Sequence, residues 1–363
     1  MHAGGSPDRG MKRLLGLVAV VPLLLAACSG GAATSAPTAE PVASAPAESA
    51  APAASEAAPE KTLELAYISF AVANSYDAPM LAAARASAAS GNANLTVFDG
   101  NLNPATQTQQ LQDAIASGKY DGIVLQPVYG PALVPGAEAA IAAGIAIGNI
   151  DQILGSDNTT ADSQVAGQLV NVVFVPSELG RKIGELVVTA CGDANPCNVG
   201  YIWSVKAAAL DATLKEAFDK ATSVNPNVKI VAEGESFYTT PLGLKAAQDM
   251  LAAHPDITVI TGADQAITGA VQAVADAGLK DSVKLVGYGG GAIAFQGIAS
   301  GERFGTVMQA PSTEGGLGVQ TFIEAIRSGT AAAGIDVLAD LPDGGVVTKD
   351  NVDKFLTLAE WPG

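Results

Sequence analysis

Short apolar segments alternate with longer, often alanine-rich segments along the chain from Lys61 onward, and this alternation constrains the fold more than any other feature. Apolar runs of about four to eight residues bounded by turn residues are typical of buried strands, and the longer segments between them are typical of helices. Strands joined through helices form βαβ units, which need a parallel sheet covered on both faces. The sequence therefore predicts an α/β fold built on parallel sheets.

The alternation falls into two similar halves. The first half predicts strands at 63–70, 95–98, 122–126 and 145–150, with helices at 79–90, 104–117 and 131–143. After Pro176 the cycle restarts, with helices predicted at 178–191, 210–224, 242–254, 268–277, 292–300 and 315–328, and strands at 198–203, 228–235, 257–261, 283–288 and 305–309. Two such halves predict two doubly wound, Rossmann-like lobes.

The first 27 residues have the features of a secretory signal. Met11-Lys12-Arg13 is basic, and 14–25 is an apolar segment too short to span a bilayer comfortably. We interpret Met11, rather than Met1, as the initiator. The segment Leu25-Ala26-Ala27-Cys28 resembles the bacterial lipobox, in which the cysteine is diacylated and becomes the first residue of the mature protein. A plain signal peptide that is cut near Ala27 is the alternative.

Residues 28–61 consist almost entirely of Ala, Pro, Ser, Thr, Gly and Glu. Such a segment has too few bulky apolar residues to order itself, so it predicts a flexible stalk. We therefore expect an exported protein that a lipid on Cys28 anchors to the membrane, either in the periplasm or on the outer face of the cytoplasmic membrane.

The charged and metal-binding residues exclude several classes of function. The chain has 19 Lys and Arg against 36 Asp and Glu, a net charge of −17, whereas a nucleic-acid-binding protein needs a basic face. With only 2 His and 3 Cys, no metal site and no cofactor are predicted. Residues 287–292 match G-x-G-x-x-A, but they lie in the last quarter of the chain and lack the acidic residue that should follow, so we expect no nucleotide site. In an exported chain, the neighbouring Cys191 and Cys197 predict a structural disulfide.

Ligands of doubly wound folds bind beyond the carboxyl ends of the strands, so the residues that follow the strands are the candidate binding residues. Most of them carry amides, carboxylates or aromatic rings, which suit a neutral polyhydroxylated ligand. The candidates are Asn74, Tyr76, Gln126, Asp151, Gln152, Trp203, Tyr238, Asp264, Gln265, Tyr288 and Gln309. No arrangement of nucleophile and base, or of two placed carboxylates, is recognisable, so no catalytic residue is predicted.

Several of these segments resemble the ribose/galactose-type periplasmic binding proteins. The similar segments are 66–68 with 74–76, 122–127, 132–137, 144–151, 251–257, 262–265, 285–288 and 305–309. They follow one another in the family's order from Leu63 to Ser328.

The resemblance implies a type I solute-binding protein of an ABC importer, whose lobes close around a ligand like a hinge. One lobe would comprise 62–174 plus 309–332 and the other 177–306 plus 335–363, with three crossings near 174–177, 306–309 and 331–335. We expect a monomer that binds a sugar-like ligand, delivers it to a membrane permease and is not an enzyme.

Individual positions match the family only in part. The resemblance implies that Asn74, Tyr76, Gln126, Asp151, Tyr238 and Gln309 contact the ligand. The arginine that usually follows the ligand carboxylate is Gln152 here, and a second family arginine falls at about Leu210. Ala263 and Gly289 replace an Asn and an Asp. These changes remove much of the hydrogen-bonding set for a pentose or hexose, so a sugar derivative, a polyol or another small cargo stays open.

Three other classes of protein share this architecture. An exported enzyme would need a nucleophile or a metal site. The effector lobe of a LacI-type repressor would need a helix-turn-helix before Leu63, where the sequence has a signal peptide and a stalk. A sensor that presents its ligand to a membrane receptor fits the sequence as well as a transport protein does.

Overall fold

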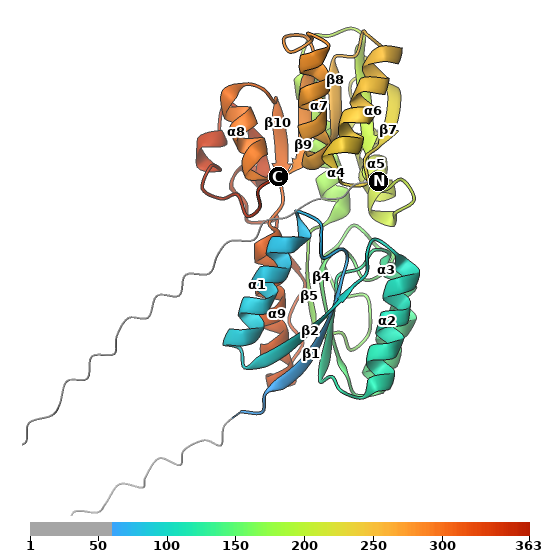
Figure 1. The fold of residues 1–363 in the computed structure, drawn as a ribbon, viewed down its shortest axis with the longest axis vertical. Coiled ribbons are helices and arrows are strands. Elements are labelled where there is room, and N and C mark those ends of the chain that lie inside the picture. The colour runs from blue at the N-terminus through green and yellow to red at the C-terminus, as the bar shows by residue number, and fades with distance from the viewer. Residues whose placement is uncertain (1–59) are drawn as a thin grey trace, which may run out of the picture. The chain divides into compact units, whose positions relative to one another are not determined.

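The computed structural model describes residues 60–363, which belong to one compact unit. In this unit the chain forms two α/β lobes, each built on a sheet of six strands (Figure 1). The predicted signal peptide, the predicted lipidation site Cys28 and all but the last two residues of the predicted stalk lie outside the described residues. The two-lobed α/β fold that the sequence predicts is confirmed.

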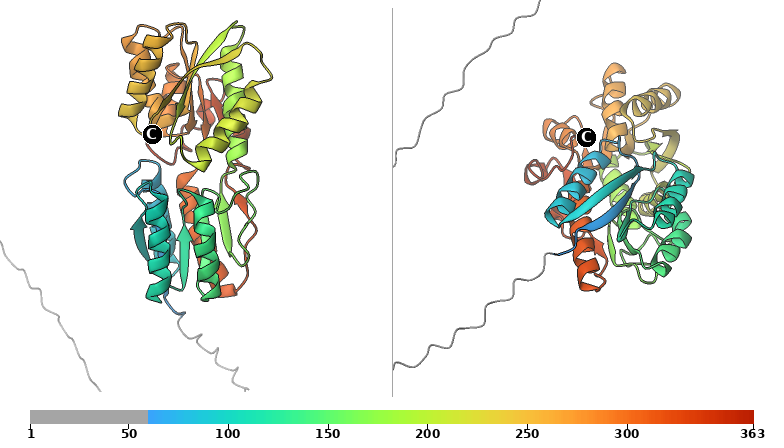
Figure 2. Two further views of the ribbon diagram at one scale, coloured as in Figure 1. Left: turned by 90° about the vertical axis from the view of Figure 1, so that its right-hand side faces the viewer. Right: turned by 60° about the horizontal axis from the view of Figure 1, so that its bottom comes forward.

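The first lobe holds the amino-terminal half of the described chain and two later elements. It contains β1 (Leu63–Ser69), α1 (Asp77–Ser90), β2 (Ala93–Asp99), α2 (Pro104–Ser117), β3 (Gly122–Leu125), α3 (Gly130–Ala142), β4 (Ala146–Asp151), β5 (Val170–Val173), α9 (Pro311–Ser328) and β11 (Ile335–Asp336). Its strand order is β11-β5-β4-β3-β1-β2, and every neighbouring pair is parallel. Helices α1 and α9 cover one face of this sheet, and α2 and α3 cover the other (Figures 1 and 2).

The second lobe repeats this plan. It contains α4 (Pro176–Cys191), β6 (Cys197–Trp203), α5 (Ala209–Thr222), β7 (Val228–Glu235), α6 (Thr240–Ala253), β8 (Val259–Ala263), α7 (Asp264–Asp276), β9 (Lys284–Gly289), α8 (Ala292–Ser300), β10 (Gly305–Met308) and β12 (Val346–Thr348), with single 3₁₀ turns at Pro342–Gly345 and Val352–Lys354. Its strand order is β12-β10-β9-β8-β6-β7, in which only the β10–β12 pair is antiparallel. Helices α4 and α5 cover one face, and α6 and α7 cover the other.

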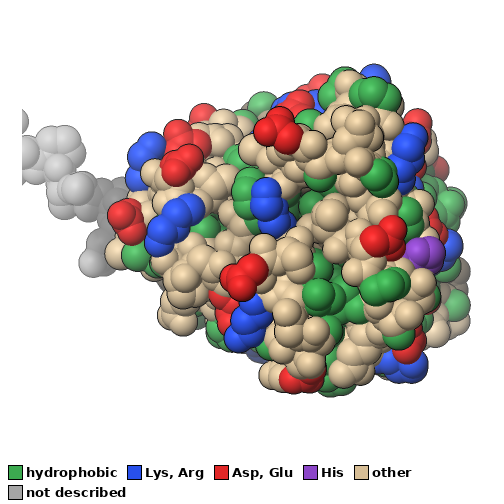
Figure 3. Space-filling view, turned by 90° about the horizontal axis from the view of Figure 1, so that it is seen from above, with side chains coloured by type: hydrophobic (Ala, Val, Ile, Leu, Met, Phe, Trp, Pro, Cys, Tyr) green, Lys and Arg blue, Asp and Glu red, His purple; other side chains and the backbone are tan. Residues whose placement is uncertain are grey.

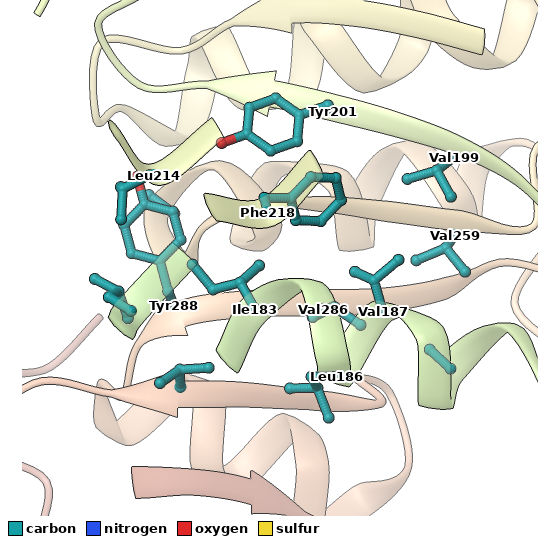
Figure 4. Close-up of a cluster of buried hydrophobic side chains, with 14 of the residues drawn as sticks. Ile183, Leu186, Val187, Val199, Tyr201, Leu214, Phe218, Val259, Val286 and Tyr288 are labelled. Atoms are coloured by element: carbon teal, nitrogen blue, oxygen red, sulfur yellow. The ribbon is translucent and has the colours of Figure 1, made fainter. Parts of the chain in front are cut away.

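Each face of each sheet carries its own apolar core. Between α4, α5 and the second sheet, Leu214 and Phe218 of α5 pack against Ile183 of α4 and Tyr201 of β6 (Figure 4). The rings of Tyr201 and Phe218 lie 5.1 Å apart. Because both faces of a parallel sheet are buried in this way, its strands are apolar along their whole length, which explains the apolar runs in the sequence.

Local sequence signals explain where individual elements begin and how closely they pack. Helix α2 begins after Asn103, whose side chain accepts hydrogen bonds from the backbone N–H groups of Ala105 and Thr106. Helices α1 and α9 approach closely because Gly315 has no side chain: a Cβ there would lie 2.1 Å from the Met80 carbonyl oxygen. The sequence of α9 therefore lets a helix from late in the chain pack on the first lobe.

The chain passes between the two sheets three times, after β5, after β10 and after β11. The last passage differs from the expectation of 331–335, because β11 still pairs with β5 in the first sheet and the chain leaves only after Asp336. Strands β5, β11 and β12 were not expected. Strands β11 and β12 have only two and three residues, and no helix separates β5 from β4, so β5 falls outside the alternation of strand and helix that predicted the other strands.

The predicted disulfide is present and joins Cys191, at the end of α4, to Cys197, at the start of β6. Among the helices of residues 60–363, none is long and apolar enough to cross a membrane.

Candidate functional site

A cavity lies between the two lobes, where the carboxyl ends of strands from both sheets meet. It is lined by Phe70, Asn74, Tyr76, Asp77, Asp151, Gln152, Phe174, Leu179, Leu210, Leu214, Tyr238, Gln265, Tyr288, Gly289, Gln309 and Trp361. The space among these residues that no atom fills, including the part open to solvent, is about 460 Å³. This position is the one at which open α/β sheets bind ligands.

Aromatic rings from opposite lobes meet at two places around the cavity. Phe70 of the first lobe and Tyr238 of the second meet edge to face, with ring centroids 6.2 Å apart. Tyr76 and Trp361 meet in the same way at 5.6 Å. These contacts hold the two lobes together next to the cavity and provide apolar surface to its lining.

Eight of the eleven candidate residues from the sequence line this cavity. They are Asn74, Tyr76, Asp151, Gln152, Tyr238, Gln265, Tyr288 and Gln309. They come from six different strand ends of two lobes, so the fold brings together residues that are far apart in the sequence. Their role as ligand contacts stays a prediction.

Gln126 lies outside the lining, because its side chain is used to hold two carboxylates. Its Oε1 accepts hydrogen bonds from the hydroxyl of Tyr67, at 3.2 Å, and from the backbone N–H of Phe70, at 3.1 Å. Its Nε2 donates to Asp77 and, at 3.0 Å, to Oδ2 of Asp151. Gln126 therefore orients the two acidic side chains of the lining from behind.

Trp203 also lies outside the lining, because its ring packs on Tyr201 with centroids 5.3 Å apart and its Nε1 donates to Glu233 at 3.1 Å. Its position after a strand suggested a ligand contact, but the side chain is held within the second lobe.

Asp264, the third candidate outside the lining, is buried, and its carboxylate interacts with groups of the second lobe. Its carboxylate pairs with Arg303 at 3.3 Å, and it accepts from the backbone N–H of Gly290 at 2.6 Å and from the hydroxyl of Thr306 at 2.9 Å. It therefore joins the start of α7 to the end of β9 and the start of β10, and it is not among the residues that line the cavity.

Eight lining residues were not among the candidates: Phe70, Asp77, Phe174, Leu179, Leu210, Leu214, Gly289 and Trp361. Among these eight residues, Trp361 is the farthest along the sequence, and the carboxyl-terminal tail places it in the second lobe. Its Nε1 donates to the carbonyl of Gly289 at 2.9 Å. A Cβ at residue 289 would lie 2.7 Å from the Trp361 ring, so glycine at the end of β9 makes room for the indole.

Burial dominates the electrostatics of the acidic side chains at the site. It raises the pKa of Asp77 well above its usual value, and the charge of Asp151 raises it further. Burial raises the pKa of Asp151 to about 7, although the hydrogen bond from Gln126 opposes this change. A carboxyl group with a pKa near 7, such as that of Asp151, exchanges its proton near neutral pH, so its charge responds to a ligand.

The backbone of Asp151 has a φ of 67°, in the left-handed region that Asp and Asn tolerate better than other non-glycine residues. This conformation ends β4 and turns the carboxylate toward Gln126 and the cavity. Backbone strain of this kind is concentrated at functional sites.

Two parallel α/β lobes around a cavity of amides, carboxylates and aromatic rings are typical of solute-binding proteins. A model of the periplasmic binding protein domain matches residues 65–330, and the chain belongs to this family. This confirms the resemblance found in the sequence.

Relatives of known function agree with this family. A D-ribose/D-allose-binding protein of Pseudomonas aeruginosa is 28% identical over 244 residues, which cover 66% of this chain and 73% of that protein. The ribose import binding protein of Escherichia coli K12 is 25% identical over 230 residues, or 63% of this chain and 73% of that protein.

Solved structures share the fold at low sequence identity. An ABC transporter solute-binding protein of Mycobacterium smegmatis with bound glycerol has a TM-score of 0.70 and 24% identity, covering 84% of this chain and 100% of the other. A galactofuranose-binding protein has a TM-score of 0.71 and 20% identity, covering 81% of this chain and 97% of the other.

Proposed function

We propose that this protein captures a sugar or a sugar derivative in the cavity between its lobes and delivers it to an ABC permease. The observation that carries the proposal is the cavity itself, where side chains from strand ends of both lobes converge. A ligand that contacts both lobes favours the conformation in which they meet, so a permease can distinguish the loaded protein from the empty one.

The chemistry of the lining supports a polar ligand with a ring. The amides of Asn74, Gln152, Gln265 and Gln309 offer donors and acceptors, and six aromatic side chains offer flat apolar surface. The names of the relatives, which bind ribose and allose, support the same class of ligand. Capture of this kind requires no bond to be broken, and we propose a binding role without catalysis.

We further propose that the protein acts outside the cytoplasm as a monomer, anchored through a lipid on Cys28. The lipobox-like segment before Cys28 and the family's periplasmic description support this location. The anchor would keep the lobes near the permease, at the end of the predicted stalk.

A thermal-shift screen of the full chain against sugars, polyols, nucleosides and amino acids tests the proposal. A ligand that binds only the folded state stabilises it by about 2.7 kcal/mol at a concentration of a hundred times Kd, so we expect the melting temperature to rise with at least one sugar or polyol. The variant Asp151→Asn should reduce the shift, since it removes a carboxylate from the lining.

The matched control is Asp113→Asn, which removes an acidic group from the exposed surface of α2 in the same lobe. This variant should keep the full shift. A shift that Asp151→Asn leaves undiminished would place the ligand elsewhere, and a shift with nucleosides or amino acids only would contradict the sugar class.

A further inference from the structure

The charged side chains that line the cavity are all acidic. Asp77 and Asp151 face it, and among its lining residues in the described part of the chain none is Lys, Arg or His. On the outer face drawn in Figure 3, acidic and basic side chains are interspersed. The cavity therefore has a single sign of charge where this outer surface has both.

A third carboxyl group, on Glu314 of α9, lies behind these two and is completely buried. Its Oε2 accepts a hydrogen bond from the Tyr76 hydroxyl at 3.4 Å, and its carboxyl group shares a hydrogen bond with the carboxyl group of Asp151. Burial raises the pKa of Glu314 well above its usual value, and the charge of Asp151 raises it further. Three carboxyl groups, those of Asp77, Asp151 and Glu314, therefore interact with one another beside the cavity.

Another buried carboxylate of this protein, that of Asp264, is paired with a cation. Asp264 of the second lobe is paired with Arg303 at 3.3 Å, and both side chains are almost fully buried. In the described chain, no ion pair involves Asp77, Asp151 or Glu314. The cluster beside the cavity therefore lacks the neighbouring positive charge that Asp264 has. Burial of a carboxylate without a cation is costly, so a cationic group next to the cluster would stabilise it.

The walls of the cavity are suited to a cation as well. The aromatic lining residues are Phe70, Tyr76, Phe174, Tyr238, Tyr288 and Trp361. The face of an aromatic ring attracts a positive charge, and the attraction is stronger where water is excluded. Acidic groups and rings around one small space together favour an organic cation over an anion or a metal ion.

We propose that the ligand carries a protonated amine, which binds beside Asp77 and Asp151, while the amides of the lining hold its hydroxyl groups. An amino sugar or an aminocyclitol has this chemistry. The inference rests on the proposed function and narrows it, because it replaces a neutral sugar with a cationic one as the preferred cargo.

Binding of a cationic ligand should change the protonation of the acidic groups beside the cavity. A cation beside Asp151 stabilises the ionised carboxylate and lowers its pKa from about 7, so binding at neutral pH should release a proton. The titratable groups around Asp151 are acids: Tyr67 of β1, Tyr76 before α1, Asp77 of α1, Glu314 of α9 and, beyond it, Glu360 of the tail. These groups titrate together, so the number of protons released on binding is a property of the whole cluster and not of Asp151 alone.

Isothermal titration calorimetry of the full chain with matched ligands tests the inference. Each amine is compared with its neutral counterpart: D-glucosamine with D-glucose, D-galactosamine with D-galactose, and an aminocyclitol with myo-inositol. We expect at least one amine to bind more than tenfold more tightly than its counterpart. Titration in two buffers of different ionisation enthalpy should show proton release for the amine and not for the neutral sugar.

Variants separate the charge from the shape of the site. Asp151→Asn keeps the size and the left-handed backbone that Asn tolerates, and it should remove most of the amine's advantage. Glu314→Gln is the second variant and should reduce it less. Asp113→Asn, on the exposed surface of α2, should leave it unchanged.

The outcomes distinguish this inference from the proposed function. If a neutral sugar binds as tightly as its amine and releases no proton, the carboxyl groups are held protonated; the inference fails and the proposed function stands. If neither series binds to a folded sample, both fail. An advantage of the amine that persists in Asp151→Asn would also overturn the inference.

Discussion

Asp211 lies behind the site: it does not line the cavity, but it contacts a residue that does. It lies in the first turn of α5, where its carboxylate accepts hydrogen bonds from the backbone N–H of Ser204, at 2.7 Å, and from the hydroxyl of Tyr238, at 3.4 Å. Burial nevertheless raises its pKa to about 7. Since Tyr238 lines the cavity, Asp211 holds a lining residue in place from within the second lobe.

The raised pKa of Asp211 predicts a stability that falls as the pH rises. Between about pH 4 and pH 7 the folded state binds a proton that the unfolded state has lost, so the free energy of unfolding decreases by up to about 1.4 kcal/mol per pH unit for this group, and it levels off above its folded pKa. Asp211→Asn keeps the acceptor for Ser204 and should remove this contribution.

Urea denaturation of both proteins across this pH range measures the difference. The gap between their free energies of unfolding should change with pH below about pH 7 and stay constant above it. Parallel curves over the whole range would show that Asp211 keeps its ordinary pKa.

Single residues of the site were predictable where a simple rule applies. The ends of parallel strands converge, so polar residues such as Asn74 and Gln309 could be assigned to one cavity from the sequence. The rule does not distinguish side chains that face the cavity from side chains whose hydrogen bonds are all made within the protein. Gln126 and Asp264 were therefore also predicted as binding residues, although neither lines the cavity. Trp361 follows no strand and was not accessible to the rule at all.

At the scale of elements, the disulfide fixes the connection between α4 and β6. Cys191 ends the helix and Cys197 begins the strand, and both are buried in the core of the second lobe. The double variant Cys191→Ala/Cys197→Ala should lower the free energy of unfolding by about 2 kcal/mol, because the short closed loop constrains the unfolded chain.

Urea denaturation of the oxidised protein, the reduced protein and the double variant tests this expectation. The first should be the most stable, and the other two should resemble each other. Equal stability of all three would mean that the core around the two sulfur atoms, and not the covalent link, holds this connection.

Long elements were easier to predict than short ones. Helix α2 was found with its observed bounds because it has a capping Asn103, a proline in its first turn and an apolar face along several turns. Helix α9 was found from its apolar face as 315–328, and its first turn, which begins at Pro311, was missed. Strands β5, β11 and β12 have two to four residues and lie at or near the edge of a sheet, where tertiary pairing rather than local sequence decides the conformation.

At the scale of the whole described unit, two sheets with separate cores are connected by three passages of the chain. The order of similar segments predicted this plan, because apolar runs and helices repeat in both halves. What the sequence did not contain was the pairing of rings across the cavity, Phe70 with Tyr238 and Tyr76 with Trp361. These pairs depend on how the lobes meet, so they follow from the structure alone.

Trp361, which contacts Tyr76 beside the cavity, can report ligand binding through its intrinsic fluorescence. The chain has 2 Trp, of which Trp361 lines the cavity and Trp203 does not. A ligand that enters the cavity changes the surroundings of Trp361 and leaves those of Trp203, which packs on Tyr201, nearly unchanged. The location of binding is therefore visible in tryptophan fluorescence.

The most direct test of the central claim, that a small solute binds between the lobes, is a fluorescence titration of the variants Trp203→Phe and Trp361→Phe with the best ligand from the screen. The account predicts a saturable change in Trp203→Phe, where Trp361 is the only reporter, and little or no change in Trp361→Phe. A saturable change that depends on Trp203 and not on Trp361 would contradict it, because the solute would then bind away from the cavity.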